Sequence, residues 1–146
     1  MIQISKYIGL TIIGLILFNI HPLNADPPQI PARISGTLSI NGTTLTDSTA
    51  RGFHIYVTKS DGTSYSPESS DTDGLSENFY TLYIPFSGSV VATQGEEAKI
   101  HVSKSGVEAT ITSPVGGVFT VGEAGSSSQI NIQGDIDLQP GLKIIF

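Results

Sequence analysis

Two histidines, His54 and His101, are the side chains with the most versatile chemistry beyond the first 25 residues. Each lies at an outward position of an alternating segment, so the two could share a metal ion if their strands were neighbours. The chain has no Cys, and a catalytic zinc site needs at least three protein ligands. We therefore expect two solvated histidines and no metal site.

An acidic turn at Asp71, Asp73 and Gly74 has the composition of a calcium loop. An EF-hand loop with Gly74 sixth would place Ser69 first and Tyr80 twelfth, where acidic ligands are required, so that motif fails. Calcium bound outside an EF-hand by Asp71 and Asp73 remains an alternative. The simpler interpretation is a turn that uses Asp and Gly for their backbone geometry.

Signals for catalysis are absent from the sequence. There is no G-x-S-x-G elbow to present a nucleophile, no thiol, and no phosphate-binding loop around Gly116 and Gly117. We predict no catalytic residue, no cofactor and no enzymatic activity.

Asn41, Gly42 and Thr43 match the sugar-acceptor triplet N-x-[ST]. The same Asn-Gly pair is also the strongest short-range signal for a two-residue β-hairpin turn. Hairpin geometry is the preferred explanation, and glycosylation of Asn41 stays open.

Aromatic residues offer a further binding chemistry, because sugars stack on exposed rings. Tyr56, Tyr80 and Tyr83 lie on predicted strands, with Phe79 on the same parity as Tyr83. The chain has no Trp, so aromatic side chains that pair across strands are the simpler prediction.

The composition of the chain limits which fold class can position these residues. The 146 residues include 16 Gly and 8 Pro, with 38% hydrophobic and only 14% charged residues, which favours one turn-rich β domain over a helical bundle. The net charge of -6 without basic clusters argues against nucleic acid as a partner.

Residues 1–25 have the pattern of a signal peptide: Lys6, an apolar run over residues 7–20, and a small residue, Ala25, before the cleavage point. An uncleaved anchor is the alternative, although the run is shorter than the ~20 residues that span a bilayer. We expect a secreted or cell-surface protein, with the periplasm included, and no membrane insertion after cleavage. Residues 26–33 form a Pro-rich spacer, 34–138 the domain, and 139–146 a tail or the start of a further strand.

Two-residue alternation predicts short strands over 33–40, 52–59, 79–84, 98–104, 107–113 and 129–133, with 107–113 forming a hairpin with the strand before it. The strand within 79–84 is expected at the centre of the domain. Glycine at position 36, on an apolar face, predicts a bulge or a close backbone approach. The inward positions are numerous enough for a two-layer core: Ile34, Leu38, Ile40, Phe53, Ile55, Val57, Leu82, Ile84, Ile100, Val102, Ile111, Ile130 and Ile132. These features predict an all-β, antiparallel sandwich of about seven strands.

In order along the chain, these segments resemble the prealbumin-like β-sandwich domains of bacterial and archaeal surface proteins, also called carboxypeptidase regulatory-like domains. The resemblance covers residues 34–138 and rests on turn placement and alternation in ISGTLSINGTTL, GFHIYVTKSDGTSY, DTDG, NFYTLYIP, GEEAKIHVSKSG and QINI. It implies an immunoglobulin-like sandwich and a non-catalytic spacer or adhesion role. One related fold is a urate-pathway hydrolase with a C-terminal tetrapeptide, and nothing here matches that ending.

Three functions follow in order of preference. The first is a secreted, non-catalytic sandwich that acts as a structural, spacer or adhesion module, with other surface proteins or glycans as partners. The second is a module that binds carbohydrate or calcium. The third is a small outer-membrane barrel, suggested by the terminal parity of Leu142, Ile144 and Phe146 but not by the strand lengths elsewhere.

Overall fold

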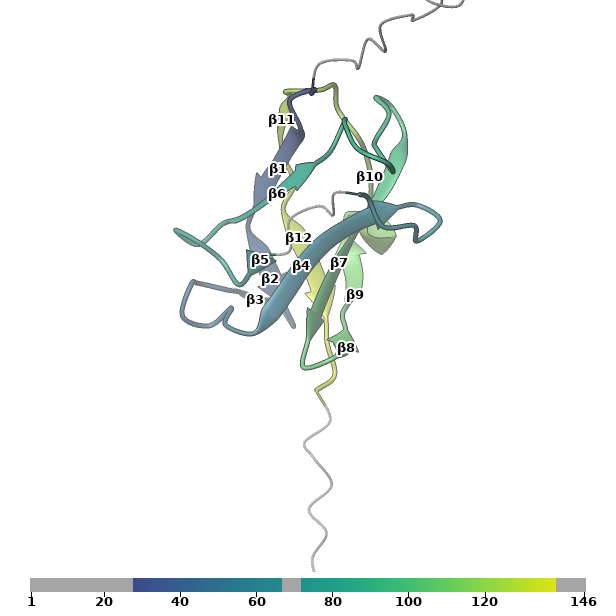
Figure 1. Cartoon of the computed structure of the whole chain (residues 1–146). Coiled ribbons are helices and arrows are strands. Elements are labelled where there is room, and N and C mark those ends of the chain that lie inside the picture. Colours follow the sequence, from purple (N-terminus) through teal and green to yellow (C-terminus); the bar gives the residue numbers. More distant parts are fainter. Residues whose placement is uncertain (1–27, 67–71, 139–146) are drawn as a thin grey trace, which may run out of the picture.

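The structure of the protein is a computed structural model that describes residues 28–66 and 72–138. The described residues form an all-β fold of twelve short strands in three sheets, with one 3-10 turn, η2 (Val115–Gly117), and no α-helix (Figure 1). The predicted signal peptide and the C-terminal tail with Phe146 lie outside the described residues. All-β architecture is therefore confirmed, and the sheet arrangement is consistent with a sandwich.

A five-stranded sheet carries the longest strands, in the order β10-β7-β4-β5 with β8 also on β7. Its strands are β4 (Phe53–Lys59), β5 (Thr72–Asp73), β7 (Glu97–Lys104), β8 (Val107–Glu108) and β10 (Val118–Thr120). Seven residue pairs join β4 to β7, from Phe53 opposite Lys104 to Lys59 opposite Ala98. The predicted alternation holds on both strands, except that Thr58, expected on the outer face, is only 4% exposed.

The other two sheets hold the remaining strands. One has the order β3-β2-β12-β9 and the other β11-β1-β6. Their bounds are β1 (Ala32–Gly36), β2 (Leu38–Ile40), β3 (Thr43–Thr44), β6 (Tyr80–Ile84), β9 (Thr110–Ser113), β11 (Ser127–Gln129) and β12 (Ile132–Asp135).

The first and last strands of the described domain lie side by side and run parallel. β1 pairs with β11 from Arg33 opposite Ser127, and β2 pairs with β12 from Leu38 opposite Ile132. We call this contact, residues 32–41 against 126–136, the parallel seam. The prediction of a purely antiparallel sandwich is wrong here, because alternation reports which face a residue occupies but not the direction of its neighbour.

Gly36 explains how the seam closes. A Cβ at this position would collide with the backbone carbonyl of Ile130. The amide of Ile130 donates to Ser35 O at 2.9 Å and that of Ile132 to Thr37 O at 2.8 Å, so the two segments of the chain are joined on both sides of Gly36. The predicted close backbone approach at Gly36 is confirmed.

Two predicted strands are each divided between sheets. The 107–113 segment pairs with β7 only at Val107 and Glu108, and β9 then joins β12 instead. The prediction of one hairpin over 107–113 is wrong beyond Ala109. Likewise 129–133 is split between β11 and β12, and Ile130 is only half-buried, whereas Ile132 is fully buried.

The strand predicted at the centre, β6, alternates as expected. Tyr80, Leu82 and Ile84 are each 0% exposed, whereas Phe79 and Tyr83 are about half exposed. β6 nevertheless pairs only with β1 and lies at the edge of its sheet. The prediction of a central strand is therefore wrong for the hydrogen-bonded sheet, because β6 is an edge strand. Its inward side chains nevertheless belong to the core.

Burial agrees with the predicted inward set except at Ile130. The other twelve predicted positions are all buried, and they pack in one cluster with Leu45, Tyr65, Tyr80 and Val121. Because the three sheets share this single apolar cluster, burial of large aliphatic side chains is the main source of stability.

Candidate functional site

A groove beside β7 is the best candidate for a binding site among the described residues. It has a volume of about 510 Å³ and is lined by side chains from β4, β7, the 108–111 segment and η2. The groove lies where the chain leaves β7 after β8 and continues into the other sheet as β9. Its polar groups are those of Tyr56, His101, Glu108, Lys99 and Thr110.

His101 is held on the groove wall by three neighbours. Its ring stacks on Tyr56, directly opposite on β4, with centroids 4.8 Å apart and an interplanar angle of 7°. Its Nε2 lies 3.0 Å from Thr58 Oγ1. The Thr58 hydroxyl donates to Lys59 O at 2.8 Å, so its oxygen can accept a hydrogen bond from Nε2.

Glu108 completes this group, which we call the His101 cluster (Tyr56, Thr58, His101 and Glu108). One carboxylate oxygen accepts the Tyr56 hydroxyl at 2.7 Å, and the other lies 3.8 Å from His101 Nδ1. Burial lowers the pKa of His101, the carboxylate of Glu108 raises it in part, and Lys99 lowers it further, so the net shift is downward. The lowered pKa favours the neutral imidazole at neutral pH.

A second carboxylate, Glu96, anchors the far end of β4. It accepts Lys59 Nζ at 2.9 and 3.1 Å and the Tyr65 hydroxyl at 2.7 Å. Lys59 Nζ also lies 5.3 Å from the centre of the Tyr65 ring. We call Lys59, Tyr65 and Glu96 the Glu96 cluster; it joins three segments that are distant in sequence.

The pKa values of Glu96 and Tyr65 are both shifted from those of free side chains. Burial acts to raise the pKa of Glu96, but the hydrogen bonds from Lys59 and Tyr65 together with the Lys59 charge outweigh it and lower that pKa. Burial, followed by the Glu96 contact, raises the pKa of Tyr65. Nothing in the alternation of the sequence indicated this cluster, because its members come from a strand end and two loops.

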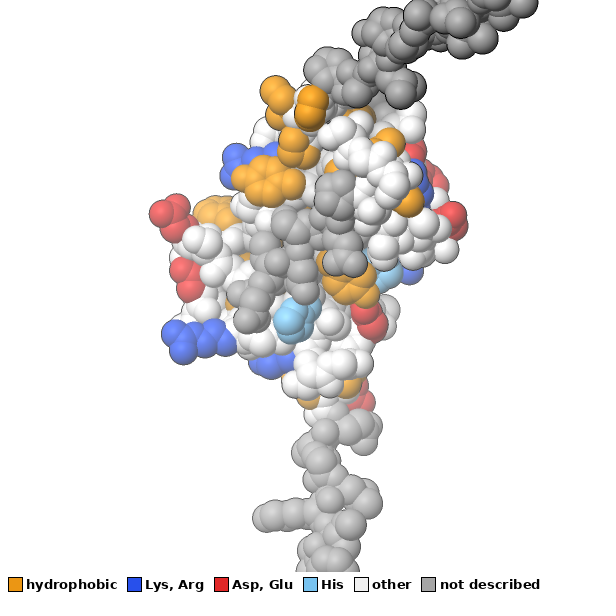
Figure 2. Space-filling model, in the orientation of Figure 1, with side chains coloured by type: hydrophobic (Ala, Val, Ile, Leu, Met, Phe, Trp, Pro, Cys, Tyr) orange, Lys and Arg blue, Asp and Glu red, His pale blue; other side chains and the backbone are white. Residues whose placement is uncertain are grey.

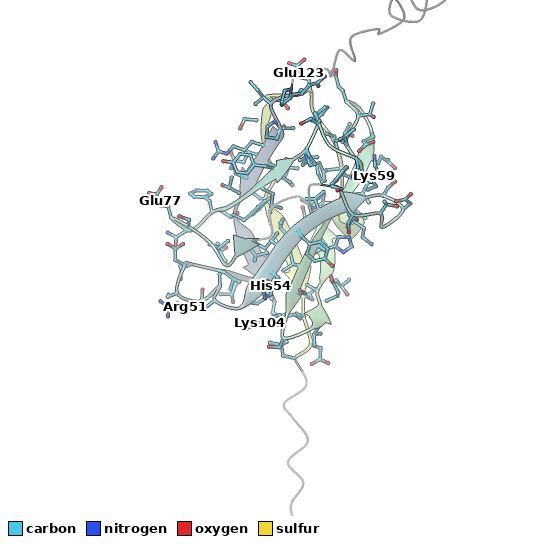
Figure 3. The ribbon with its side chains drawn as sticks, in the orientation of Figure 1. Arg51, His54, Lys59, Glu77, Lys104 and Glu123 are labelled. Carbon is cyan, nitrogen blue, oxygen red and sulfur yellow. The ribbon has the colours of Figure 1, made fainter. Side chains whose placement is uncertain are left out.

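The two histidines lie on neighbouring strands, as a shared metal site would require. His54 is opposite Ser103, two residues from His101 on β7, and Figure 3 shows His54 on the early part of β4 and Lys59 at its end. However, both ring nitrogens of His101 face protein partners. Within residues 28–66 and 72–138, no group of three or more His, Asp or Glu side chains could hold a metal ion.

The candidate calcium turn is only partly described. Asp71 lies outside the described residues, as does the side chain of Asp73, so the calcium alternative remains untested. The backbone of Asp73 pairs with His54. Gly74 has a φ of 86° and donates to Phe53 O at 2.8 Å, which agrees with the predicted backbone turn.

Asn41 has a structural role that the sequence analysis missed. Asn41 and Gly42 have φ of 50° and 74° and connect β2 to β3, so the hairpin prediction is confirmed. The Asn41 side chain also grips the backbone of Ile136: Nδ2 donates to its O at 3.0 Å and Oδ1 accepts from its N at 2.9 Å. The nitrogen that would carry a glycan is thus occupied at the end of the parallel seam.

The predicted aromatic face is divided by the fold. Tyr80 is fully buried, with its hydroxyl donating to Ile130 O, so it cannot contribute to a sugar-binding surface. Tyr83 lies opposite Arg33, not opposite another aromatic residue. Within the described residues, Tyr56 stacks across the strands on His101, a ring that is not part of the predicted aromatic set.

Surface charge on the visible face is mixed. Figure 2 shows acidic and basic side chains scattered over this face without a patch of one sign, and hydrophobic side chains gathered toward one end.

Asp47 is a further acidic side chain with a structural role. Its carboxylate accepts the backbone amides of Glu77 at 3.0 Å and Asn78 at 2.6 Å, and so joins two turns.

No protein-family model matches the chain, and neither a curated protein nor a solved structure matches it significantly. In the part of the chain that the structure describes, there is no helix with the length and apolar character needed to cross a bilayer.

Proposed function

We propose that this chain is a secreted or cell-surface, non-catalytic β-sandwich module of the immunoglobulin-like or prealbumin-like type, with a structural, spacer or adhesion role. The leader over residues 1–25 supports export. The turn placement that resembles carboxypeptidase regulatory-like domains supports a role in a surface assembly.

The observation that carries this proposal is how the ionisable and amide side chains are used. Glu96, Glu108 and Asp47 each accept hydrogen bonds that connect separate segments, and the Asn41 side chain bonds to the backbone of Ile136, just after β12. Groups committed in this way stabilise a scaffold, whereas a catalytic group must be available to a substrate. Partners would be other surface proteins or glycans, with no nucleic acid.

Export and inertness are testable together. The full chain with a C-terminal epitope should reach the cell surface or medium, where added protease removes the epitope, and deletion of residues 2–25 should retain it inside the cell. Detection of the full-length product inside intact cells, protected from protease, would contradict the proposal. So would turnover by the purified chain of an ester, peptide or glycoside substrate that is lost on His101→Phe.

The groove beside β7 favours a second candidate, a carbohydrate-binding module. Tyr56 and His101 present a ring pair at the groove wall, with Lys99 and Glu108 as polar neighbours. Titration calorimetry with a glycan panel should then detect binding that Tyr56→Ala abolishes and that Tyr83→Ala, on β6 and outside the groove lining, leaves intact. Heat signals absent for the whole panel would leave the scaffold role as the better account.

A further inference from the structure

We propose that the parallel seam makes this domain load-bearing: a tensile force along the chain is carried in shear by the hydrogen bonds that join the first strands to the last. This inference rests on the proposed spacer function, because a spacer in a surface assembly is the setting in which the chain would be pulled from both sides.

The direction of the strands carries the argument. The chain enters at β1 at one end of the domain and leaves after β12 at the other end (Figure 1). Because β1 and β2 run parallel to β11 and β12, tension draws the start of one pair and the end of the other in opposite directions along their common axis. Because hydrogen bonds between parallel strands are evenly spaced along the pair, they share a load applied along the strands, whereas bonds at a peeled edge break one at a time.

The seam is bonded over its whole length. Gly125 N donates to Ile30 O at 3.0 Å and Arg33 N to Ser126 O at 2.8 Å near the start. Ile130 and Ile132 donate across the middle, and Asn41 N donates to Gly134 O at 2.9 Å near the end.

Two side-chain amides reinforce the seam at its weak points. Thr37, where β1 gives way to β2, donates its N–H to Asn131 Oδ1 at 3.2 Å. At the far end, Asn41 holds both backbone groups of Ile136. The Thr37 contact bridges the break between the short strands, and the Asn41 contacts extend the seam past β12, so the two segments behave as one continuous ladder under load.

The seam also delivers force straight from the first strands to the last. The remaining strands, including the five-stranded sheet, lie outside this direct path. A contact such as that of Asp47 with the 77–78 turn should therefore support folding without resisting tension.

The test is single-molecule force spectroscopy on the full chain with paired cysteine handles, which the Cys-free sequence allows. Ile30→Cys with Leu138→Cys pulls along the seam in shear. Thr43→Cys with Leu138→Cys pulls two points at the same end and peels β2 from β12. We expect a clearly higher unfolding force for the 30–138 pair, and equal forces for the two pairs would overturn the inference.

Two matched variants locate the load. Asn41→Gly keeps the positive-φ turn but removes both contacts to Ile136, and should raise the unfolding rate on the 30–138 axis about tenfold at fixed force, as expected for the loss of two hydrogen bonds. Asp47→Ala removes two backbone contacts off the path and should leave that rate nearly unchanged. Equal effects of the two variants would also contradict the inference.

Failure of the proposed function would look different. A chain that stays inside the cell contradicts the spacer role whatever the forces, whereas equal forces on both axes contradict load-bearing wherever the chain resides.

Discussion

The parallel seam and the five-stranded sheet use polar side chains in contrasting ways. The seam is joined by backbone groups and the amides of Asn41 and Asn131, which do not titrate. The five-stranded sheet is held by ion pairs instead, Glu108 with His101 on its outer face and Glu96 with Lys59 at the end of β4. The seam should therefore give strength that is independent of pH, while the shifted pKa values of Glu96 and His101 make part of the stability of the sheet respond to pH.

The two clusters of the five-stranded sheet also differ from each other. In each, a carboxylate accepts a tyrosine hydroxyl at 2.7 Å. Glu96 lies 2.9 Å from Lys59 Nζ, whereas Glu108 lies 3.8 Å from His101 Nδ1 and is half exposed. A carboxylate thus serves as a firm anchor in one place and makes a weak, solvent-screened contact in the other.

The largest effect should come from breaking the seam. Gly36→Ala places a Cβ against the carbonyl of Ile130, which is backbone and cannot rotate away, and we expect a loss of about 3 kcal/mol in the free energy of unfolding. Chemical denaturation at neutral pH measures it. Ser35→Ala on the same strand is the control, expected to cost less than about 1 kcal/mol; a similar loss for both would refute the seam's tight packing.

Removal of the firm anchor should have the next largest effect. Glu96→Ala leaves the buried Tyr65 hydroxyl and Lys59 without their shared acceptor, and should cost about 2 kcal/mol after allowance for partial exposure. Urea unfolding at pH 7 gives the value. Tyr65→Phe, which removes only the hydroxyl, should cost about half as much, and no loss for either variant would show that this cluster is not an anchor.

The His101 cluster should add a pH dependence. The folded-state pKa of His101 lies below its ordinary value of 6.5, so the unfolded chain takes up the proton first and stability falls as the pH drops through 6.5 toward the lower folded pKa. The Glu96 contribution, with a pKa lowered from 4.5, persists until more acid conditions. His101→Phe, which retains the stacked ring, should flatten the stability profile between about pH 7.5 and 5; an unchanged slope would exclude His101 as its source.

The smallest effect at neutral pH should be that of Glu108→Gln. The side chain is 52% exposed and Gln still accepts the Tyr56 hydroxyl, so the loss at pH 7.5 should be below about 0.5 kcal/mol. At pH 5 the loss should be greater, because Glu108 is the group that favours protonated His101. Equal losses at both pH values would contradict the contact.

Much of the fold could be predicted from two-residue alternation and turn residues. β4, β6 and β7 were found with the correct inward faces, as were the Asn41–Gly42 turn and the close approach at Gly36. These features are local, because the face that a strand residue occupies and the φ that a turn residue prefers depend on a few neighbouring residues.

What the sequence did not reveal depends on partners distant in the chain. Alternation could not indicate that the last strands run parallel to the first. Nor could it indicate that the chain leaves β7 after Ala109 and pairs with β12 as β9. Turn propensity predicts the hairpin at Asn41 but not its side-chain contact with Ile136, because that contact joins residues 95 positions apart. The Glu96 cluster was missed for the same reason.

The most direct test of the account is residue-resolved amide hydrogen exchange of the full chain. The amides of Ile130, Ile132 and Asn41 donate across the parallel seam. We predict that these three exchange only through global unfolding, at rates that do not change between pH 7.5 and 5 once intrinsic exchange and global stability are accounted for. Exchange as fast as that of the exposed turn at Gly62 would show that the first and last strands are not held together, and would contradict the account.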